Sequence, residues 1–368
     1  MLREGGLPRP YADSHPLNIE EVDLDPPSKD EVLIKVKAVG LCHSDLVAIS
    51  GERARPLPMV IGHEAAGIVE EVGPNVEGLV SGDHVAAAFV ASCGHCDMCR
   101  EGRPSLCKPA NIANCSGTLM DGTTRLHKEG NRIHHHSGVA GFAEYAVISK
   151  NALVKIDPIV PFQYAAMFGC AVMTGVGAVF NTAHVRSGQS VAVVGLGGVG
   201  LSSLMAARAA GAGMVIAVDV QKDKLDLARE LGAHEVYNAT DADFELLIRK
   251  MTDGGVDLAL ETAGSPRALE TAYAITRRGG MTVTAGLPGP EATITLQHLS
   301  FASEERCLKG SYMGSCIPSR DIPRYISLFL DGRLPVDRLM SRSISFGELN
   351  EAFDRLANVT TVREILVI

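Results

Sequence analysis

The sequence contains no tryptophan, and aromatic residues make up only 5% of its 368 positions. It has no excess of positive charge either: the formal net charge is −9, which argues against nucleic acid or an anionic membrane as a partner. No apolar run is long enough to span a membrane, and no apolar segment typical of a signal peptide follows Met1. Internal repeats and low-complexity segments are also absent. We therefore expect a cytoplasmic protein of about two domains.

Nine cysteines in a chain without a secretory signal favour metal binding or catalysis over disulfides. Four of them, Cys93, Cys96, Cys99 and Cys107, fall within fifteen residues. Thiolates at this spacing can surround one tetrahedral metal ion and leave no open coordination position. An iron–sulfur cluster is the alternative, but in ferredoxins the fourth cysteine follows after three residues and precedes proline. Here seven residues intervene and Lys108 follows, so the pattern predicts a structural zinc site that fixes a loop.

The first part of the chain is mainly β in character and the middle part alternates between strands and helices. A half-buried strand is expected at 31–39, where apolar and polar residues alternate, and further strands are expected at 64–72, 83–90 and within 143–156. Beyond residue 162, buried strands are expected at 191–194, 214–218, 257–260 and 281–285, with helices at 199–211, 221–231 and 266–277. This alternation predicts a parallel, doubly wound sheet. Mixed character returns after about residue 313, with a helix near 347–357 and a final strand at 364–368.

A glycine-rich turn follows the expected strand at 191–194. It reads Gly195-Leu196-Gly197-Gly198-Val199-Gly200 and lies between a strand and a helix, the context that a dinucleotide-binding fingerprint requires. The glycines permit a tight turn and close approach to a pyrophosphate, and the helix N-terminus offers free N–H groups to the phosphates. Asp219, at the end of strand 214–218, can bond a ribose 2′-hydroxyl and repel a 2′-phosphate. We therefore expect NAD rather than NADP as cofactor.

Three further residues, Cys42, His63 and Cys170, could form a second zinc site with an open position. Spacing alone does not join them, because Cys170 lies over a hundred residues beyond the other two. Taken singly, each is more often a buried cysteine or a satisfied histidine than a ligand. Together with the motifs above, however, their segments resemble the zinc-dependent, medium-chain alcohol dehydrogenases. The likeness runs essentially end to end and includes Gly-His-Glu-Ala-Ala-Gly at 62–67 and Val-Arg-Glu-Ile-Leu at 362–366.

The resemblance implies an α/β protein with two domains. One would be a GroES-like, mainly β catalytic domain over 1–170 and 313–368. The other would be a doubly wound Rossmann domain over 171–312 that binds the nucleotide. In this family two cysteines and one histidine hold the catalytic zinc, with water or alcohol in the fourth position. Zinc lowers the pKa of the bound hydroxyl, and a hydride then passes to the nicotinamide.

Supporting roles follow from the resemblance by motif position. Ser44 would pass the substrate proton outward, Asp45 would orient the zinc-bound histidine, and Glu64 would stand behind the zinc. Val47 occupies the position where some relatives carry a relay histidine, so the proton must leave by another route.

Contacts to the cofactor are implied in the same way. His43 and Arg363 match cationic positions near the pyrophosphate, and Lys224 matches a lysine near the adenosine ribose. Thr174 and Val199 match contacts to the nicotinamide.

The substrate pocket is the least defined part of the resemblance. Its matching positions are Arg53, Phe89, Ile112, His136, Leu287 and Tyr312. Arg53 and His136 are polar and are expected to face the outer cleft, which favours an aromatic or polar alcohol over ethanol. The segment 116–138 is expected to be a solvated loop with one histidine near the cleft. The three consecutive histidines at 134–136 diverge and do not readily chelate one ion.

The expected activity is that of an NAD-dependent zinc alcohol dehydrogenase acting on a primary or secondary alcohol, with two zinc ions per subunit. A formaldehyde dehydrogenase that uses glutathione or mycothiol is the nearest alternative, although Arg53 stands where glutathione-using members favour an acidic residue. A non-catalytic protein that binds NAD and zinc is the third. The segment 294–313, which is expected to be rich in strands, and the long loop at 116–138 both resemble dimeric members of the family. At least a homodimer is therefore expected, with a tetramer as the alternative.

Overall fold

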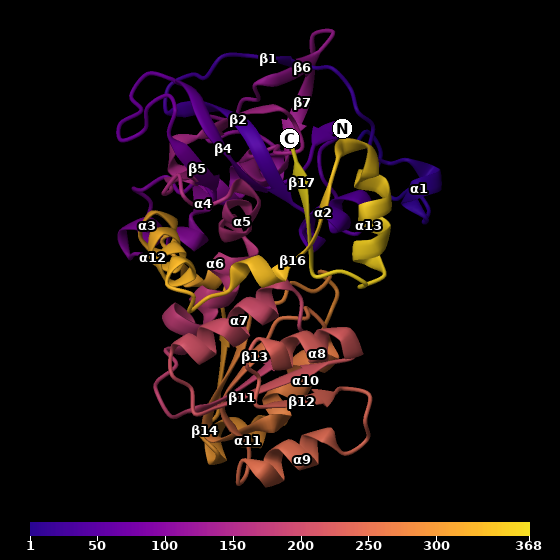
Figure 1. Ribbon diagram of the computed structural model, residues 1–368, viewed down its shortest axis with the longest axis vertical. Helices are drawn as coiled ribbons and strands as arrows, with labels where there is room; N and C mark the ends of the chain where they lie inside the picture. Colours follow the sequence, from indigo (N-terminus) through magenta and orange to yellow (C-terminus); the bar gives the residue numbers. More distant parts are fainter. The chain divides into compact units, whose positions relative to one another are not determined.

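The computed structural model describes the whole chain, from Met1 to Ile368, and its internal contacts divide it into two compact units. The first unit comprises Met1–Cys170, Ile317–Ile326 and Val336–Ile368, and the second comprises Ala171–Cys316 and Ser327–Pro335. Figure 1 shows the chain coloured from the N-terminus to the C-terminus. Helix α12 (Pro318–Leu330) contributes residues to both units.

A seven-stranded sheet forms the centre of the first unit. Its strands, in spatial order, are β16 (Met340–Ile344), β17 (Arg363–Val367), β2 (Glu31–Gly40), β4 (Glu64–Val72), β5 (His84–Ala87) and β9 (Leu153–Lys155), with β8 (Tyr145–Ser149) also paired to β2. All pairs are antiparallel except β16 with β17. The alternation that predicted β2 reflects real burial, because Val32, Ile34 and Val36 are fully buried.

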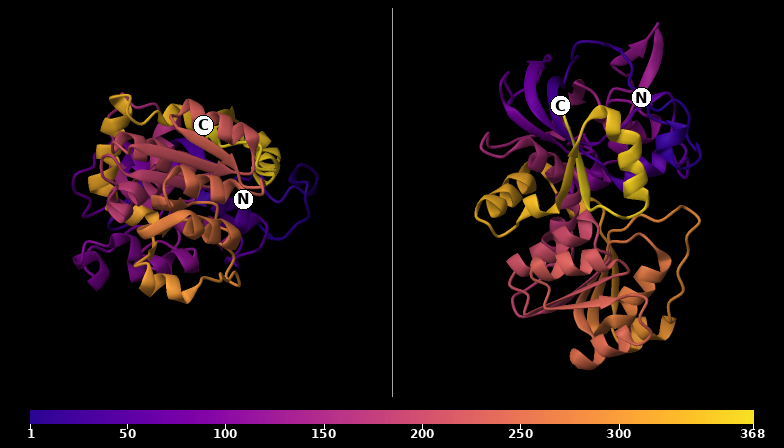
Figure 2. Two further views of the ribbon diagram at one scale, coloured as in Figure 1. Left: turned by 90° about the horizontal axis from the view of Figure 1, so that it is seen from below. Right: turned by 45° about the vertical axis from the view of Figure 1, so that its right-hand side comes forward.

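Segments from the two ends of the chain lie side by side in this unit. Strand β17 pairs with β2, and α13 (Leu349–Ala357) packs beside α1 (Tyr11–Ser14), as Figures 1 and 2 show. The remaining helices of the unit are α2 (His43–Ile49), α3 (Asp97–Arg100), α4 (Lys108–Ser116) and α5 (Phe162–Ala165). Its short helical turns are η1 (Pro104–Leu106), η2 (His136–Gly138), η3 (Lys150–Ala152), η4 (Ala166–Gly169), η7 (Val336–Leu339) and η8 (Phe346–Glu348).

A second, four-stranded sheet corrects the expectation of a solvated loop over 116–138. Its order is β1 (Asp23–Leu24), β6 (Leu126–Lys128), β7 (Asn131–His135) and β3 (Met59–Val60). Strands β6 and β7 form a hairpin whose two-residue turn, Glu129 and Gly130, has positive φ at both positions. That turn matches the twist of paired strands. The hairpin buries Leu126 and Ile133, which explains why the segment is ordered and not a solvated loop.

The second unit contains a six-stranded, fully parallel sheet. The order is β12 (Glu235–Asn238), β11 (Met214–Asp219), β10 (Ser190–Val194), β13 (Val256–Glu261), β14 (Thr276–Thr284) and β15 (Cys307–Gly310). The next two strands along the chain, β11 and β12, lie on one side of β10, and the later strands, β13, β14 and β15, lie on its other side. The order therefore reverses at β10, and ligands of open α/β sheets bind at the carboxyl ends of the strands at such a point.

The helices of the second unit are α6 (Ala171–Gly177), η5 (Ala178–Ala183), α7 (Gly198–Ala209), α8 (Lys222–Glu230), α9 (Phe244–Met251), α10 (Pro266–Ile275), α11 (His298–Ser303) and η6 (Met313–Ser315). Helices α9 and α10 cover one face of the sheet, where Phe244 and Ile248 pack with Ile275 and the strand residues Val194 and Ile216. The doubly wound prediction is confirmed.

The expectation that 294–313 is rich in strands is wrong. The segment holds α11 and a single four-residue strand, β15. Across the whole chain, no single helix has both the length and the apolar character of a membrane span. One bent pair of helical segments, Phe162–Gly169 with Ala171–Ala183, passes that test by length and composition only.

Candidate active site

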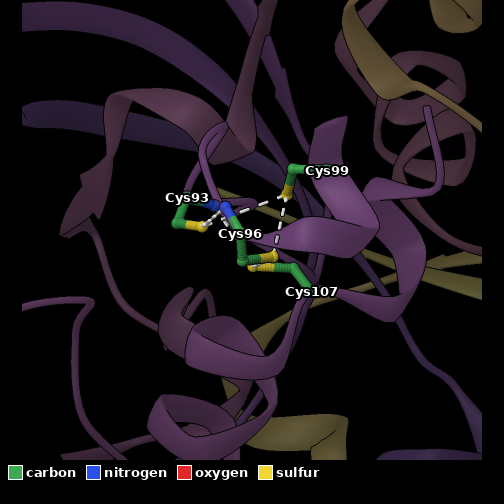
Figure 3. A group of neighbouring side chains, drawn as sticks. All are labelled: Cys93, Cys96, Cys99 and Cys107. Carbon is green, nitrogen blue, oxygen red and sulfur yellow. Dashed lines mark hydrogen bonds between the residues drawn. The ribbon is translucent and has the colours of Figure 1, made fainter. Parts of the chain in front are cut away.

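The four cysteines of the predicted structural site converge in the first unit, as Figure 3 shows. The Sγ atoms of Cys96 and Cys99 are 3.6 Å apart, those of Cys96 and Cys107 are 3.9 Å apart, and those of Cys93 and Cys99 are 4.0 Å apart. Zinc–sulfur bonds of about 2.3 Å in a tetrahedron place the sulfurs roughly 3.8 Å from one another. The geometry therefore fits one ion held by four thiolates, with no open position.

Local backbone geometry prepares this cluster. The N–H of Cys96 donates to the Sγ of Cys93 at 3.3 Å, and the N–H of Cys93 donates to the Sγ of Cys107 at 3.2 Å. Hydrogen bonding, first from the backbone of Cys99, lowers the pKa of Cys96 to about 6, whereas burial raises the pKa of Cys99 to about 12. One thiolate thus forms readily, and a cation is needed to stabilise all four.

A second cluster joins three segments that are far apart in the sequence. Side-chain donor atoms of Cys42, His63, Glu64 and Cys170 all lie within 4.8 Å of one another, and all four residues are buried in the first unit. Cys42 precedes α2, His63 and Glu64 enter β4, and Cys170 follows η4. The fold thus brings together the three ligands that the resemblance implied.

Two glycines allow these segments to approach. Gly62 has φ +90°, and a Cβ there would lie 2.8 Å from the Phe142 ring. A Cβ on Gly169 would collide with the carbonyl oxygen of Ala87. Side chains at either position would displace the adjacent residues, His63 and Cys170.

Asp45 fixes the orientation of His63. Its Oδ1 accepts the Nδ1–H of His63 at 3.0 Å and the N–H of Gly62 at 3.1 Å, while its Oδ2 accepts the N–H of Cys42 at 3.1 Å. A carboxylate can only accept, so the Nδ1 of His63 is the donor in this bond, and Nε2 is the ring nitrogen that remains to bind an ion. Burial opposes ionisation of Asp45, but the imidazoles of His63 and His136 hold the pKa of this carboxyl well below its usual value.

Glu64 and Arg363 add a buried ion pair behind the cluster. The two side chains approach to 3.4 Å, and Arg363 also donates to the carbonyl oxygen of Leu41 at 3.0 Å. Neither oxygen of Glu64 has a hydrogen-bond partner, although the side chain is fully buried, and burial raises its pKa to about 8. A buried carboxyl group that receives no hydrogen bond, beside two thiols and an imidazole, fits a site built for a cation.

The thiol of Cys42 is the more acidic of the two in this cluster. Its hydrogen bond with Cys170 lowers the pKa of Cys42 well below the usual value, and His63 and Arg363 act in the same direction. The same hydrogen bond and burial raise the pKa of Cys170. This donor set of two sulfurs and one imidazole fits zinc with one coordination position left over.

The glycine-rich turn of the second unit has the form expected for binding a pyrophosphate. Gly195 has φ +94°, and a Cβ there would lie 2.7 Å from Ala263. No atom lies within 4 Å of a Cβ built on Gly197, and no side chain caps the twelve-residue helix α7. The N-terminus of α7 is therefore open to an anion. Asp219 accepts the backbone N–H groups of Leu196 at 2.6 Å and Gln221 at 2.9 Å.

The other predicted residues lie in different environments. Thr174 and Lys224 are buried in the second unit, and Val199 and Asp219 are partly buried there. His43 is exposed and Ser44 is partly buried on α2. The predicted pocket residues range from partly buried to exposed: Arg53, Phe89, Ile112, Leu287 and Tyr312.

His136 departs from the prediction. It is 1% exposed, and its Nδ1 lies 2.9 Å from Asp45 Oδ1. The expectation that it faces the outer cleft from a solvated loop is wrong, because β7 carries it into the interior. Sequence reasoning also missed the pairing of Arg363 with Glu64. No local pattern links residues so far apart in the chain.

Residues 28–158 match the model of the alcohol dehydrogenase GroES-like domain, and residues 198–331 match that of the zinc-binding dehydrogenase family. A structure from Burkholderia ambifaria, named as an alcohol dehydrogenase zinc-binding domain protein, is 36% identical with a TM-score of 0.94; the match covers 100% of this chain and 97% of the other.

Two further structures are similar. Benzyl alcohol dehydrogenase from Acinetobacter calcoaceticus is 34% identical over 95% of each chain, with a TM-score of 0.91. A protein of Sinorhizobium meliloti 1021, named as a zinc-binding dehydrogenase and bound to NADP, is 26% identical over 94% of each chain, with a TM-score of 0.78. The family models cover most of this chain between them, and the chain belongs to the zinc-dependent alcohol dehydrogenase family of medium-chain dehydrogenases, as an oxidoreductase with a GroES-like and a Rossmann domain.

Proposed function

We propose that the protein is an NAD-dependent zinc alcohol dehydrogenase that interconverts a primary or secondary alcohol with the corresponding aldehyde or ketone. The observation that carries this proposal is the buried set of Cys42, His63 and Cys170, with the carboxyl group of Glu64, which receives no hydrogen bond, beside it. When bound, zinc would supply a Lewis acid that acidifies the alcohol, and NAD would supply the hydride acceptor.

The chain's own residues would hold and orient these groups. The hydrogen bond from His63 to Asp45 leaves Nε2 as the atom free to bind a cation. Ser44, at the start of α2 and partly exposed, would take the proton from the alcohol and pass it outward. Thr174 and Val199 would contact the nicotinamide, and His43, Lys224 and Arg363 the rest of the cofactor. Arg363 would then divide its donors between the cofactor and Glu64.

The preference for NAD is proposed from Asp219. Two backbone N–H donors fix its carboxylate at the end of β11, where it would meet the adenosine ribose. A 2′-phosphate would be repelled there. In Asp219→Gly this repulsion is lost. The ratio of kcat/KM for NAD to that for NADP should therefore fall by about tenfold or more, which corresponds to about 1.4 kcal/mol of transition-state discrimination between the two cofactors. Steady-state kinetics with both cofactors measure this ratio; a wild-type preference for NADP would contradict the proposal.

An aromatic alcohol is proposed as the preferred substrate class. A relative that is 34% identical is named for benzyl alcohol, and the partly buried Arg53 adds a polar group where we place the outer pocket. Turnover should be measured with ethanol and benzyl alcohol, and with formaldehyde with and without glutathione or mycothiol. We expect the highest kcat/KM with benzyl alcohol. Activity only with formaldehyde and a thiol would replace this proposal, and no turnover with bound zinc and NAD would favour a non-catalytic role.

We also propose that the protein assembles as a homodimer or larger. Strand β15 is the edge of the parallel sheet and is exposed over most of its length. A second copy's β15, related by a two-fold axis, could continue the sheet across an isologous interface. Sedimentation at micromolar concentration tests this assembly, and a stable monomer would refute it.

A further inference from the structure

The buried position of His136 is fixed by the backbone around it. Strands β3 and β7 run in parallel, with Val60 opposite His135, so His136 lies beside the segment that leads into His63. Backbone bonds continue this alignment, since the N–H of Phe142 donates to Ile61 at 2.9 Å and that of Gly141 to Gly62 at 2.7 Å. The carbonyl oxygen of His136 accepts from Val139 at 3.1 Å.

His136 shares a single carboxylate oxygen with His63. Asp45 Oδ1 lies 2.9 Å from the Nδ1 of His136 and 3.0 Å from the Nδ1 of His63, and it also accepts the N–H of Gly62. Asp45 is fully buried. A buried carboxylate depends on its N–H donors, because each lost donor leaves part of the charge unsatisfied. His136 therefore supplies one of the four donors that keep this carboxylate charged and in place.

The ring of His136 also packs against that of His63. The centroids of the His136 and His63 rings are 5.3 Å apart, with an interplanar angle of 87°. The His63 ring also contacts the ring of Phe89, with a centroid distance of 5.7 Å and an interplanar angle of 78°. The side chain of His136 thus makes two different contacts: it donates a hydrogen bond to Asp45, and its ring packs edge-to-face against the ring of His63. The two can be separated experimentally, because phenylalanine keeps the ring and asparagine keeps an N–H donor.

We propose that His136 is a positioning residue of the catalytic metal site, whose Nδ1–H holds Asp45 in the orientation that directs His63 toward the ion. This inference rests on the proposed function, because it takes Cys42, His63 and Cys170 as the zinc ligands. Without the N–H donor of His136, the Asp45 carboxylate would shift toward its remaining donors. Its hydrogen bond to His63 would then change direction, and the imidazole of His63 would turn with it. Partners of this kind typically change metal affinity or activity by 10- to 100-fold when removed.

The test compares His136→Phe with His136→Asn in zinc-loaded protein. Each protein is mixed with excess dipicolinate, and zinc release is followed with a metallochromic dye. The release phase that is missing in Cys42→Ser is assigned to the open site. His135→Gln serves as the matched control, because His135 is equally buried but accepts from the backbone N–H of Arg125 and does not contact Asp45. Cobalt-substituted protein gives a second readout in the visible absorption of the open site.

We expect zinc release to be about tenfold faster in His136→Phe, with an altered cobalt spectrum. In His136→Asn and His135→Gln both properties should stay close to wild type. Release from His136→Phe at the wild-type rate or slower would overturn the proposal, and so would equally fast release from His136→Asn, since ring packing would then be the cause. If His136→Phe does not fold, release from His136→Asn decides alone: wild-type release supports the donor role and fast release refutes it.

These outcomes are separate from the fate of the proposed function. Wild-type protein that retains zinc in the open site but oxidises no alcohol would refute the activity, while the comparison of release rates would still decide the role of His136. Wild-type protein with no zinc outside the four-cysteine cluster would overturn both.

Discussion

The two cysteine clusters of the first unit differ in their span along the chain and in their surroundings. The four-cysteine cluster comes from one short segment, and three of its members are only partly buried. The side chains of Cys42, His63 and Cys170 come from three distant segments, and each is less than 8% exposed. The closed cluster is held by local backbone N–H groups, whereas the open one is backed by buried charged side chains.

The difference reflects what each site has to do. A closed site needs only to hold its ion, and local geometry is enough for that. An open site must hold its ion and also control the reactivity of what binds there, so its ligands need partners of their own. Asp45, Glu64 and Arg363 are 0%, 0% and 5% exposed, and they are costly to bury unless they interact with one another or with an ion.

The largest effect is expected from Cys42→Ser. A serine hydroxyl is a much poorer ligand than a thiolate, so the open site should lose its ion and, with it, several kcal/mol of transition-state stabilisation. We expect kcat with benzyl alcohol to fall by about a thousandfold or more, while the melting temperature changes little. Steady-state kinetics, metal analysis and thermal unfolding measure the three quantities. Activity within tenfold of wild type would show that Cys42 is not a ligand.

Cys96→Ser should have the opposite pattern. Loss of a ligand from the closed cluster removes metal-binding free energy that contributes directly to folding. A loss of about 3 kcal/mol would lower the melting temperature by roughly 6–12 °C for a unit of this size. Protein that remains folded should turn over at close to the wild-type rate.

The control for this variant is Cys115→Ser. Cys115 is an exposed cysteine at the end of α4 that belongs to neither cluster. It should leave both stability and turnover unchanged. An unchanged melting temperature in Cys96→Ser, or two zinc ions still bound per subunit, would refute the structural role of the four-cysteine cluster.

The same contrast explains what the sequence could predict. The four-cysteine cluster is local, so spacing alone identified it. Strand β2 was predicted over 31–39, almost its observed range, because alternation is also local. The open site could be assembled only through family resemblance, since nothing in the spacing connects Cys170 to Cys42. The β6–β7 hairpin was missed because its strands are short, with three and five residues. Because the hairpin was missed, the environment of His136 was also predicted wrongly, since that residue follows directly from β7.

Acid stability should change least, and it tests whether the buried interior of the first unit differs from the four-cysteine segment, residues 93–107. His135 is fully buried, its Nδ1 has no partner, and burial lowers its pKa to about 4. The unfolded chain binds a proton near pH 6.5, so between pH 6.5 and 4 the unfolded state takes up a proton that the folded state does not. The contribution of neutral His135 to the free energy of unfolding is therefore fully present above pH 6.5, and it is lost as the pH falls from 6.5 to 4.

At pH 4.5 this linkage should cost about 2–3 kcal/mol relative to pH 7. His135→Gln removes the titration and keeps an acceptor for the N–H of Arg125, so the loss of stability between pH 7 and pH 4.5 should be smaller by about that amount. Denaturant unfolding at the two pH values measures the difference, which cancels any constant effect of the substitution. His95→Gln, at an exposed position between Cys93 and Cys96, is the matched control and should keep the wild-type pH dependence. Equal acid sensitivity in wild type and His135→Gln would show that buried titrating groups do not distinguish the two regions.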